Sequence, residues 1–395
     1  MLPRRVYLVS GFDPRGPGQL QRLLSRQLVE HCRSRQLHHR SGRRLRGNGW
    51  SGFEVLEAAG GPPVLEVLLL HWHSVVRREW PRSPLLLLGG GFRRYASYLL
   101  RGLLLKAQRQ SGSGAFTLFW PWVYGLAAAL VILLLLALVA ALLAPLPLAA
   151  PLKAPLLLAA AALLAWLSWR EASRRRIGWL YRSIRYTDRL ARGLDGGLEA
   201  VLSDHLEQIR QLEAQAPAAE LLLIGHSCGS YVAAMLAARL RRQPAMAPLL
   251  PRLRLLTLGQ NLVHLAGLPE ADSFRRDLAC LALAPAVPWL DVRSPDDWIS
   301  CAGSHPYRAA GLPARADYPQ VRLLPLLERL GLQGAWARLN HQFVMHFLYF
   351  HTTAPGANTP GANTPGGEAP AEAFNLFDLL LADPDPAALP RRRAI

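Results

Sequence analysis

A long uncharged stretch in the middle of the chain limits the possible folds more than any other feature. Residues 111–152 include no charged side chain, and after Lys153 the chain is uncharged again as far as Trp169. A helix that crosses a bilayer needs about 20 apolar residues. We therefore predict a transmembrane helical hairpin, with one span from about Phe119 to Leu143 and a second from about Leu148 to Trp169.

Residues of three kinds mark the ends of this hairpin. Prolines gather around the join between the spans, where a tight turn is expected: Pro145, Pro147, Pro151 and Pro155. Tryptophan and tyrosine lie at the outer ends, as in an interfacial belt. Positive charge lies on both outer flanks: Arg93, Arg94, Arg101, Lys106 and Arg109, then Arg170, Arg174, Arg175, Arg176 and Arg182. The join carries only Lys153. The positive-inside rule then predicts a two-pass protein of the inner (cytoplasmic) membrane, with both termini cytoplasmic.

The composition of the rest of the chain excludes several classes of site. The net charge is +18 and comes almost wholly from arginine, but basic and aromatic residues do not alternate as they do in RNA-binding and single-strand-binding modules, so we predict no nucleic-acid partner. The four cysteines have no zinc-ligand or CxxC spacing, so we predict no metal. Reduced thiols fit a cytosolic face. The sequence does not indicate an oligomeric state.

The segments on either side of the hairpin have the pattern of alternating strands and helices. Short apolar runs predict strands at Val6–Val9, Phe53–Leu56, Val64–Leu70, Leu221–Ile224, Leu253–Leu258 and Val287–Val292. Between them, Leu202, His205 and Ile209 share one face of a helix, with Glu207 and Glu213 on other faces. Buried strands separated by helices predict an α/β fold with a mostly parallel sheet covered by helices on both faces.

The predicted organisation interrupts this α/β domain with the hairpin. The parts are residues 1–110 as its first part, 111–169 as the hairpin, 170–351 as its second part, 352–373 as a flexible loop rich in Pro, Gly and Thr, and 374–395 as a C-terminal segment. In that last segment, Phe374–Leu381 is apolar enough to form a short docking helix. The basic tail after it is predicted to be disordered.

One motif carries the chemistry of the chain. Gly225-His226-Ser227-Cys228-Gly229 follows the predicted strand Leu221–Ile224 directly and opens the helical run Ser230–Arg242. A sharp strand-to-helix turn of this kind pushes a serine hydroxyl out above the edge of a sheet. Glycines flank the serine because a side chain there would clash in so tight a turn. Ser227 is therefore the predicted nucleophile.

With this motif the chain resembles the α/β-hydrolase superfamily, and in particular its GHSxG lipases and esterases. A narrower resemblance is to bacterial membrane-associated hydrolases of this fold that have an N-terminal SGFDPRG segment, here residues 10–16. The resemblance covers most of the chain outside the hairpin and the tail, and implies an α/β-hydrolase-like fold. It also implies a catalytic triad in the order Ser, Asp or Glu, then His. The departures are the inserted hairpin and an uncertain histidine position.

The resemblance places the other triad residues downstream of the motif. The acid belongs in the loop after the strand Val287–Val292, and Asp297 resembles the loop acid that precedes a bulky apolar residue in related hydrolases; Asp296 stays open as the alternative. Asp291, within the strand, is expected to be structural. For the histidine we predict His346, which resembles the narrower group because an aromatic run follows it, with His341 as the alternative.

An acyl-transfer site also needs two backbone N–H groups that stabilise the developing oxyanion. One is expected from Cys228, the residue after the nucleophile. The other is expected from the loop after the first strand, where Phe12 has the best position.

These residues predict a membrane-anchored serine hydrolase that acts through an acyl-enzyme, without metal or organic cofactor. From the predicted location, the substrate is expected to be a lipid or another acyl ester or thioester at the cytoplasmic face. Two alternatives stay open. An acyltransferase would use the same serine, and a non-catalytic membrane scaffold could keep the hydrolase fold.

Overall fold

The chain forms an eight-stranded α/β unit and a smaller helical unit. The computed structural model describes residues 2–57, 60–110, 112–147, 150–352 and 374–382. The first compact unit consists of Met1–Trp80, Lys106–Gly114 and Tyr186–Ile395. The second consists of Pro81–Leu105 and Ala115–Arg185. The second unit therefore contains more than the two long apolar helices.

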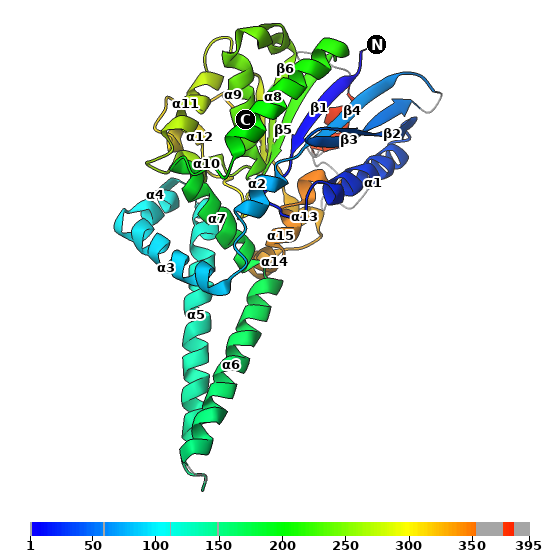
Figure 1. The fold of residues 1–395 in the computed structure, drawn as a ribbon. Helices are drawn as coiled ribbons and strands as arrows, with labels where there is room; N and C mark the ends of the chain where they lie inside the picture. The colour runs from blue at the N-terminus through cyan, green and yellow to red at the C-terminus, as the bar shows by residue number, and fades with distance from the viewer. Residues whose placement is uncertain (1, 58–59, 111, 148–149, 353–373, 383–395) are drawn as a thin grey trace, which may run out of the picture. The chain divides into compact units, whose positions relative to one another are not determined.

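The first unit holds every strand of the described residues (Figure 1). The strands are β1 (Arg4–Val9), β2 (His39–Gly47), β3 (Trp50–Glu57), β4 (Pro63–Leu70), β5 (Glu220–His226), β6 (Leu253–Leu258), β7 (Trp289–Arg293) and β8 (Gln320–Leu323). Its helices are α1 (Gly18–Ser34), α2 (His73–Arg78), α8 (Leu198–Gln215), α9 (Gly229–Arg242), η1 (Pro244–Arg252), α10 (Leu262–Ala266), α11 (Asp272–Leu281), α12 (Pro306–Ala309), α13 (Leu326–Arg329), α14 (Gly334–Asn340), α15 (Gln342–Met345), η2 (Leu348–Phe350) and α16 (Leu376–Leu381).

The sheet is mostly parallel, as the apolar strands predict. Its strand order is β2-β3-β4-β1-β5-β6-β7-β8. Neighbours from β4 through β8 pair in parallel, whereas β2 with β3 and β3 with β4 pair antiparallel. Each predicted strand is present within a few residues, so the α/β class is confirmed. The sequence did not predict β2 and β8, which are the two edge strands.

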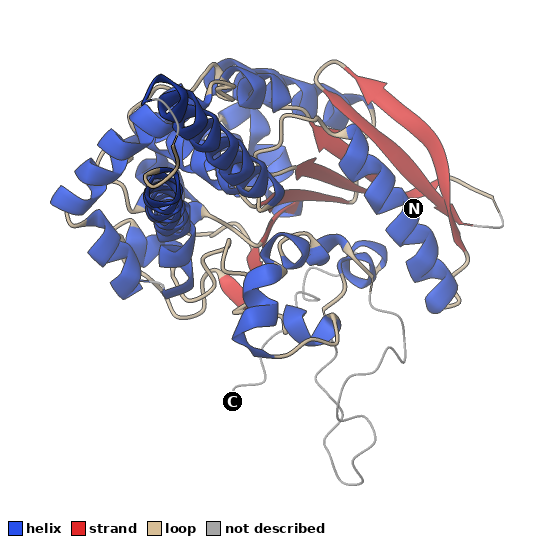
Figure 2. Ribbon diagram, turned by 90° about the horizontal axis from the view of Figure 1, so that it is seen from below, coloured by secondary structure: helices blue, strands red, loops and turns tan. Residues whose placement is uncertain are grey.

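Helices cover both faces of this sheet (Figure 2). On β1, Val6 and Leu8 lie in the same buried cluster as Leu24 and Leu28 of α1. The intervening Tyr7 donates a hydrogen bond from its hydroxyl to Glu213 of α8, on the opposite face. Since side chains alternate between faces along a strand, α1 and α8 cover different faces. All of β1 is buried, as expected for a central parallel strand.

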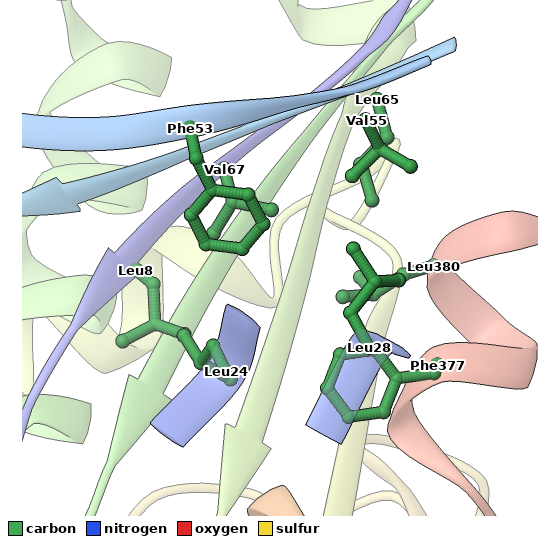
Figure 3. Close-up of a pocket in the computed structure, with 9 residues that line it drawn as sticks. All are labelled: Leu8, Leu24, Leu28, Phe53, Val55, Leu65, Val67, Phe377 and Leu380. Atoms are coloured by element: carbon green, nitrogen blue, oxygen red, sulfur yellow. The ribbon is translucent and has the colours of Figure 1, made fainter. Parts of the chain in front are cut away.

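A small apolar cavity lies in the core between the sheet and helices α1 and α16 (Figure 3). Aliphatic and aromatic side chains line it: Leu8, Leu24, Leu28, Phe53, Val55, Leu65, Val67, Phe377 and Leu380. A cavity without polar partners does not hold ordered water. It is a packing gap, and no residue predicted to act in catalysis lines it.

Helix α8 buries two polar side chains. His205 is buried on the apolar face, as predicted, but Glu213 is also buried, with 4% of the residue exposed. Its carboxylate forms an ion pair with Arg5 at 2.6 Å and accepts a hydrogen bond from the Ala218 N–H at 3.1 Å. The carboxylate is thus buried although it lies outside the apolar face, because an arginine on β1 supplies a buried partner.

The second unit is built from helices. Helices α3 (Pro84–Leu100) and α6 (Ala150–Arg174) lie within it, and α4 (Leu103–Gln110), α5 (Gly112–Leu143) and α7 (Ile177–Ala191) belong in part to each unit. Residues Leu118–Leu143 and Pro151–Arg174 are long and apolar enough to cross a membrane, and the most apolar stretch of each has no buried residue. These two spans agree with the predicted hairpin segments.

The join between the two spans differs in detail from the prediction. Helix α5 ends at Leu143 and α6 begins at Ala150, so Pro151 lies in the first turn of α6 and Pro155 lies inside the helix. Proline fits a first helical turn because its missing N–H has no intrahelical acceptor there. Lys153 also lies in α6, and its ammonium donates to the carbonyl of Ala144, just after α5. The prolines and the lysine are thus not confined to the turn.

The C-terminal part is described only in short pieces. Phe374 and the helix α16 pack against the core cluster, which confirms the predicted docking helix. The predicted flexible loop, apart from Thr352, and the basic tail from residue 383 lie outside the described residues.

Candidate active site

Ser227 occupies a sharp turn between β5 and α9. Its φ is +54°, and it is one of three non-glycine residues with positive φ in the described part of the chain. Its N–H donates to the carbonyl of Leu258 at 3.0 Å, and its carbonyl accepts from the Ser230 hydroxyl at 2.5 Å. A left-handed backbone at a side-chain-bearing residue costs about 1–3 kcal/mol and persists only where the surroundings hold it. The motif thus forms the strand–turn–helix that its sequence predicts.

The glycines of the motif are required by close backbone approach. A Cβ on Gly229 would lie 2.4 Å from the carbonyl oxygens of Val9 and Ser10. A Cβ on Gly225 would lie 2.6 Å from the Cα of Ser230. A side chain at Gly229 would push α9 away from the end of β1, and one at Gly225 would push it away from β5. The glycines therefore let α9 lie close to both strands.

His226 connects this turn to the histidine segment. The residue is 1% exposed, and its Nε2 lies 2.7 Å from the backbone oxygen of His346. Because a carbonyl only accepts, Nε2 carries the proton and donates. Burial, followed by the nearby His346, lowers the pKa of His226 well below its usual range, so the ring is neutral. The motif histidine thus anchors the backbone at His346.

Asp297 and His346 lie in hydrogen-bond contact. His346 Nδ1 is 2.8 Å from Oδ2 of Asp297, and both residues are buried. The acid lies in the loop after β7, and the histidine follows directly after α15. Oδ1 of Asp297 accepts from the Ile299 N–H at 3.1 Å, and Oδ2 also accepts from the Tyr349 hydroxyl at 3.1 Å. A carboxylate held in this way orients the imidazole and stabilises its protonated form.

The alternative residues have other partners. Asp296 pairs with Arg338 at 3.0 Å and accepts from the backbone N–H of Leu327. His341 Nδ1 lies 2.8 Å from the carbonyl oxygen of Ala337. Asp291 is ion-paired with Arg293 inside the sheet, as expected for a structural residue. The structure therefore brings together Asp297 with His346 and neither of the alternatives.

Ser227 and His346 are not joined by a hydrogen bond in this structure. Among the described residues, Nε2 of His346 is buried and has no hydrogen-bond partner. The Ser227 hydroxyl instead lies 3.4 Å from the side-chain amide of Asn261. Catalytic hydrogen bonds are often long before substrate binds and tighten in the complex. Among the described residues, the buried Nε2 therefore keeps its hydrogen-bonding capacity unused.

Asn261 is a site residue that sequence reasoning missed. One end of its amide lies 2.8 Å from the Ile299 carbonyl oxygen and 3.2 Å from that of Gln260. Carbonyls only accept, so this end is the NH₂ group, and the amide oxygen is the end that faces Ser227 and Cys228. Asn261 therefore links the nucleophile turn to the acid loop. Its position just after β6, next to β5, was the available signal.

The loop predicted to supply an oxyanion N–H lies beside Ser227. A Cβ on Gly11 would lie 3.0 Å from Cβ of Ser227, so the loop after β1 passes directly over the serine. Phe12, in this loop, is 1% exposed and stacks on Trp80 and Tyr186 with centroid distances of 5.6 and 5.1 Å. This packing fixes the backbone at Phe12. In the described part of the chain, neither its N–H nor that of Cys228 donates to another backbone group.

The chemistry of other groups near the serine is limited. Burial raises the pKa of the Cys228 thiol to about 11, so it stays protonated and does not compete as a nucleophile. All four cysteines are free and buried. Within the described ranges, no three His, Cys, Asp or Glu side chains are arranged to hold a metal ion.

Comparisons of this chain with protein-family models, with curated proteins and with solved structures found no match.

Proposed function

We propose that the chain is a serine hydrolase that cleaves an acyl ester or thioester through an acyl-enzyme. One arrangement of residues carries the proposal. Ser227 lies at positive φ just after β5, and the adjacent His226 donates to the backbone oxygen of His346. The ring of His346 in turn contacts Asp297. Strained backbone conformations cluster at active sites, so a serine at positive φ next to a histidine that bonds the carboxylate–imidazole segment supports this chemistry.

In the proposed reaction, Ser227 Oγ attacks the acyl carbonyl carbon while its proton moves to Nε2 of His346. Asp297 holds Nδ1 and stabilises the imidazolium. The N–H groups of Phe12 and Cys228 would bind the oxyanion. Collapse of the tetrahedral intermediate releases the alcohol or thiol with the proton from His346. Water then attacks the acyl-enzyme by the same proton transfers and frees the acid and Ser227.

Two features support an α/β-hydrolase-like fold for this chemistry. The order of the residues along the chain is Ser, Asp, His, and they follow β5, β7 and β8 of a mostly parallel sheet. The oxyanion loop follows β1, the strand directly beside β5. In α/β hydrolases the same parts occur in the same chain order at the corresponding edge of the sheet.

The missing hydrogen bond between Ser227 and His346 favours a second candidate, a non-catalytic membrane scaffold that keeps this fold. A fluorophosphonate probe distinguishes the two, because it reacts only with a serine activated by its base. We expect the full-length protein to be labelled, and Ser227→Ala to lose labelling and hydrolysis of a short-chain nitrophenyl ester by about 10³-fold or more. Ser203→Ala removes an exposed hydroxyl of α8 that donates to the Glu199 carbonyl at 3.0 Å, so it is the control and should stay labelled. An unlabelled wild-type protein would support the scaffold.

We also propose that the two apolar helices anchor the enzyme in the cytoplasmic membrane, with its catalytic residues in the cytoplasm. The support is the length and apolar surface of the helices and the arginines that flank them. An anchored site of this kind meets lipids and acyl esters most readily, so these are the proposed substrates.

The proposed topology predicts the behaviour of C-terminal fusions. A reporter that matures only in the cytoplasm should be active after residue 395, and one that folds only in the periplasm should be inactive. A fusion of each reporter to the join after Leu146 is the internal control and should give the reverse pattern. Equal activity of both reporters at the C-terminus, or a reversed result there, contradicts the topology.

A further inference from the structure

The buried hydroxyl of Tyr349 contacts the acid of the proposed triad. It donates to Oδ2 of Asp297 at 3.1 Å, and this is the oxygen that also accepts from Nδ1 of His346 at 2.8 Å. The backbone N–H of Ile299 binds the other oxygen at 3.1 Å. Three donors thus converge on one carboxylate. Two of them are side chains from a single short segment, three residues apart.

Tight packing fixes the place of this hydroxyl. Tyr349 is 1% exposed. Its ring lies against the backbone of Gly259, where φ is +51° and an added Cβ would be 2.6 Å from the ring and 3.2 Å from Oδ2 of Asp297. The loop after β6 must therefore have glycine at this position to let the ring approach. Filling the core does not require a hydroxyl, because phenylalanine has nearly the same shape.

We propose that Tyr349 is a positioning residue for the acid. Its hydroxyl keeps Oδ2 of Asp297 pointing toward Nδ1 of His346. The inference rests on the proposed function, because it assigns a role within the same site. Tyr349 touches neither substrate nor reacting atoms, and it acts through Asp297.

The hydroxyl suits this role because it is a permanent donor. Burial, followed by the charge of Asp297, raises the pKa of Tyr349 well above its usual range. It therefore remains protonated wherever the enzyme is active. A buried carboxylate is stabilised by each donor that it accepts from, and hydrogen bonds to charged groups are the stronger kind. Without this donor the carboxylate would attract the protonated imidazole more strongly and would be freer to rotate.

The other ionisable groups around Asp297 do not obscure its effect on His346. Burial keeps the pKa of His226 well below and that of the Cys301 thiol above their usual ranges. On β7, Asp291 and Arg293 are paired with each other at 2.5 Å. Asp297 and His346 are therefore the ionisable pair that the Tyr349 hydroxyl affects.

The test is the rate of fluorophosphonate labelling of the full-length protein in detergent, measured against pH for wild type and Tyr349→Phe. We expect the maximal labelling rate to fall by about 10-fold, the loss typical of one hydrogen bond to a buried charge. We also expect the midpoint of the acid limb to move to higher pH by about one unit, because that limb reports protonation of the base.

Tyr318→Phe is the matched control. Tyr318 is also buried and also donates its hydroxyl, to the carbonyl of Leu281 at 2.9 Å, away from the triad. Its loss should lower the melting temperature without moving the pH profile. If Tyr349→Phe behaves like this control, or labels within two-fold of wild type with an unmoved acid limb, the positioning role is overturned.

A second variant keeps the test valid if Tyr349→Phe does not fold. Placing 3-fluorotyrosine at position 349 alone keeps the ring and the hydroxyl but makes the hydroxyl a stronger donor. The acid limb should then move to lower pH, opposite to the Phe variant, and an unmoved limb would count against the role.

A wild type whose labelling does not depend on Ser227 would remove the proposed function itself, and the role of Tyr349 with it. Ser227-dependent labelling that is insensitive to Tyr349 would remove only the latter.

Discussion

Replacement of His346 by Gln is expected to lower ester hydrolysis by about 10³-fold or more, while the melting temperature stays near that of the wild type. The expectation follows from the contact of its Nδ1 with Asp297 and from its buried Nε2, which has no partner among the described residues. Asp297→Asn should have a similar effect, because it changes the hydrogen bond that sets the imidazole tautomer. Initial rates with a nitrophenyl ester and thermal unfolding of each variant provide the measurement.

The chain offers a neighbour of each residue as a control. His341→Gln should stay active. Among the described residues, the one hydrogen bond of the His341 ring is with the nearby backbone carbonyl of Ala337. Asp296→Asn should also stay active, although it weakens the ion pair with Arg338. An inactive but folded His341→Gln variant would assign the base to His341 and contradict the assignment to His346.

Replacement of Glu213 by Ala is expected to cause the largest loss of stability, about 3–5 kcal/mol in the free energy of unfolding. Its carboxylate is 1% exposed and pairs with Arg5, whose side chain is 3% exposed. Removing the carboxylate leaves the Arg5 guanidinium in the core, where Glu66 is its one remaining acidic partner among the described residues. For a domain of this size the melting temperature should fall by about 10 °C or more, which thermal unfolding in detergent would measure.

Glu207→Ala is the matched control for this prediction. Glu207 lies on the same helix, is 49% exposed and pairs with Arg210 at 2.5 Å. Exposed pairs of this kind contribute about 0–1 kcal/mol, so the change in melting temperature should be small. Equal losses in the two variants would mean that the burial of Glu213 does not determine its contribution.

The sequence predicted the parts of the fold that are buried. Strands β1, β5 and β6 are apolar runs because both of their faces are covered. Strand β2 has the sequence HRSGRRLRG, and its arginines lie on an exposed edge of the sheet, where apolar periodicity is not required. Charged residues on edge strands also oppose pairing with other chains. Strand β8 is short, lies at the other edge and has no buried residue.

The candidate site could be predicted only in part, for a similar reason. A turn such as that at Ser227 has a local signature, because strand, glycines and helix follow one another in sequence. The choice between Asp296 and Asp297 depends on which way each side chain points. Asp296 points toward Arg338 and Asp297 toward His346, and both partners are more than 40 positions away. Tyr349 contributes through such a contact alone, so no local pattern identifies it, whereas the position of Asn261 just after β6 was a usable signal.

The strand order also has a consequence for the order of events during synthesis. Strands β1 to β4 come from residues 4–70 and strands β5 to β8 from residues 220–323, and the two halves of the sheet meet only where β1 pairs with β5. Both apolar helices lie between the two halves in sequence, so they leave the ribosome after β4 and before β5. Until β5 is made, β1 has an open apolar edge, which is prone to wrong pairing. Because Phe12 follows β1 and Ser227 follows β5, pairing of these two strands is also the step that brings the proposed nucleophile to the proposed oxyanion loop. A nascent chain can therefore complete this site only after both apolar helices have been made.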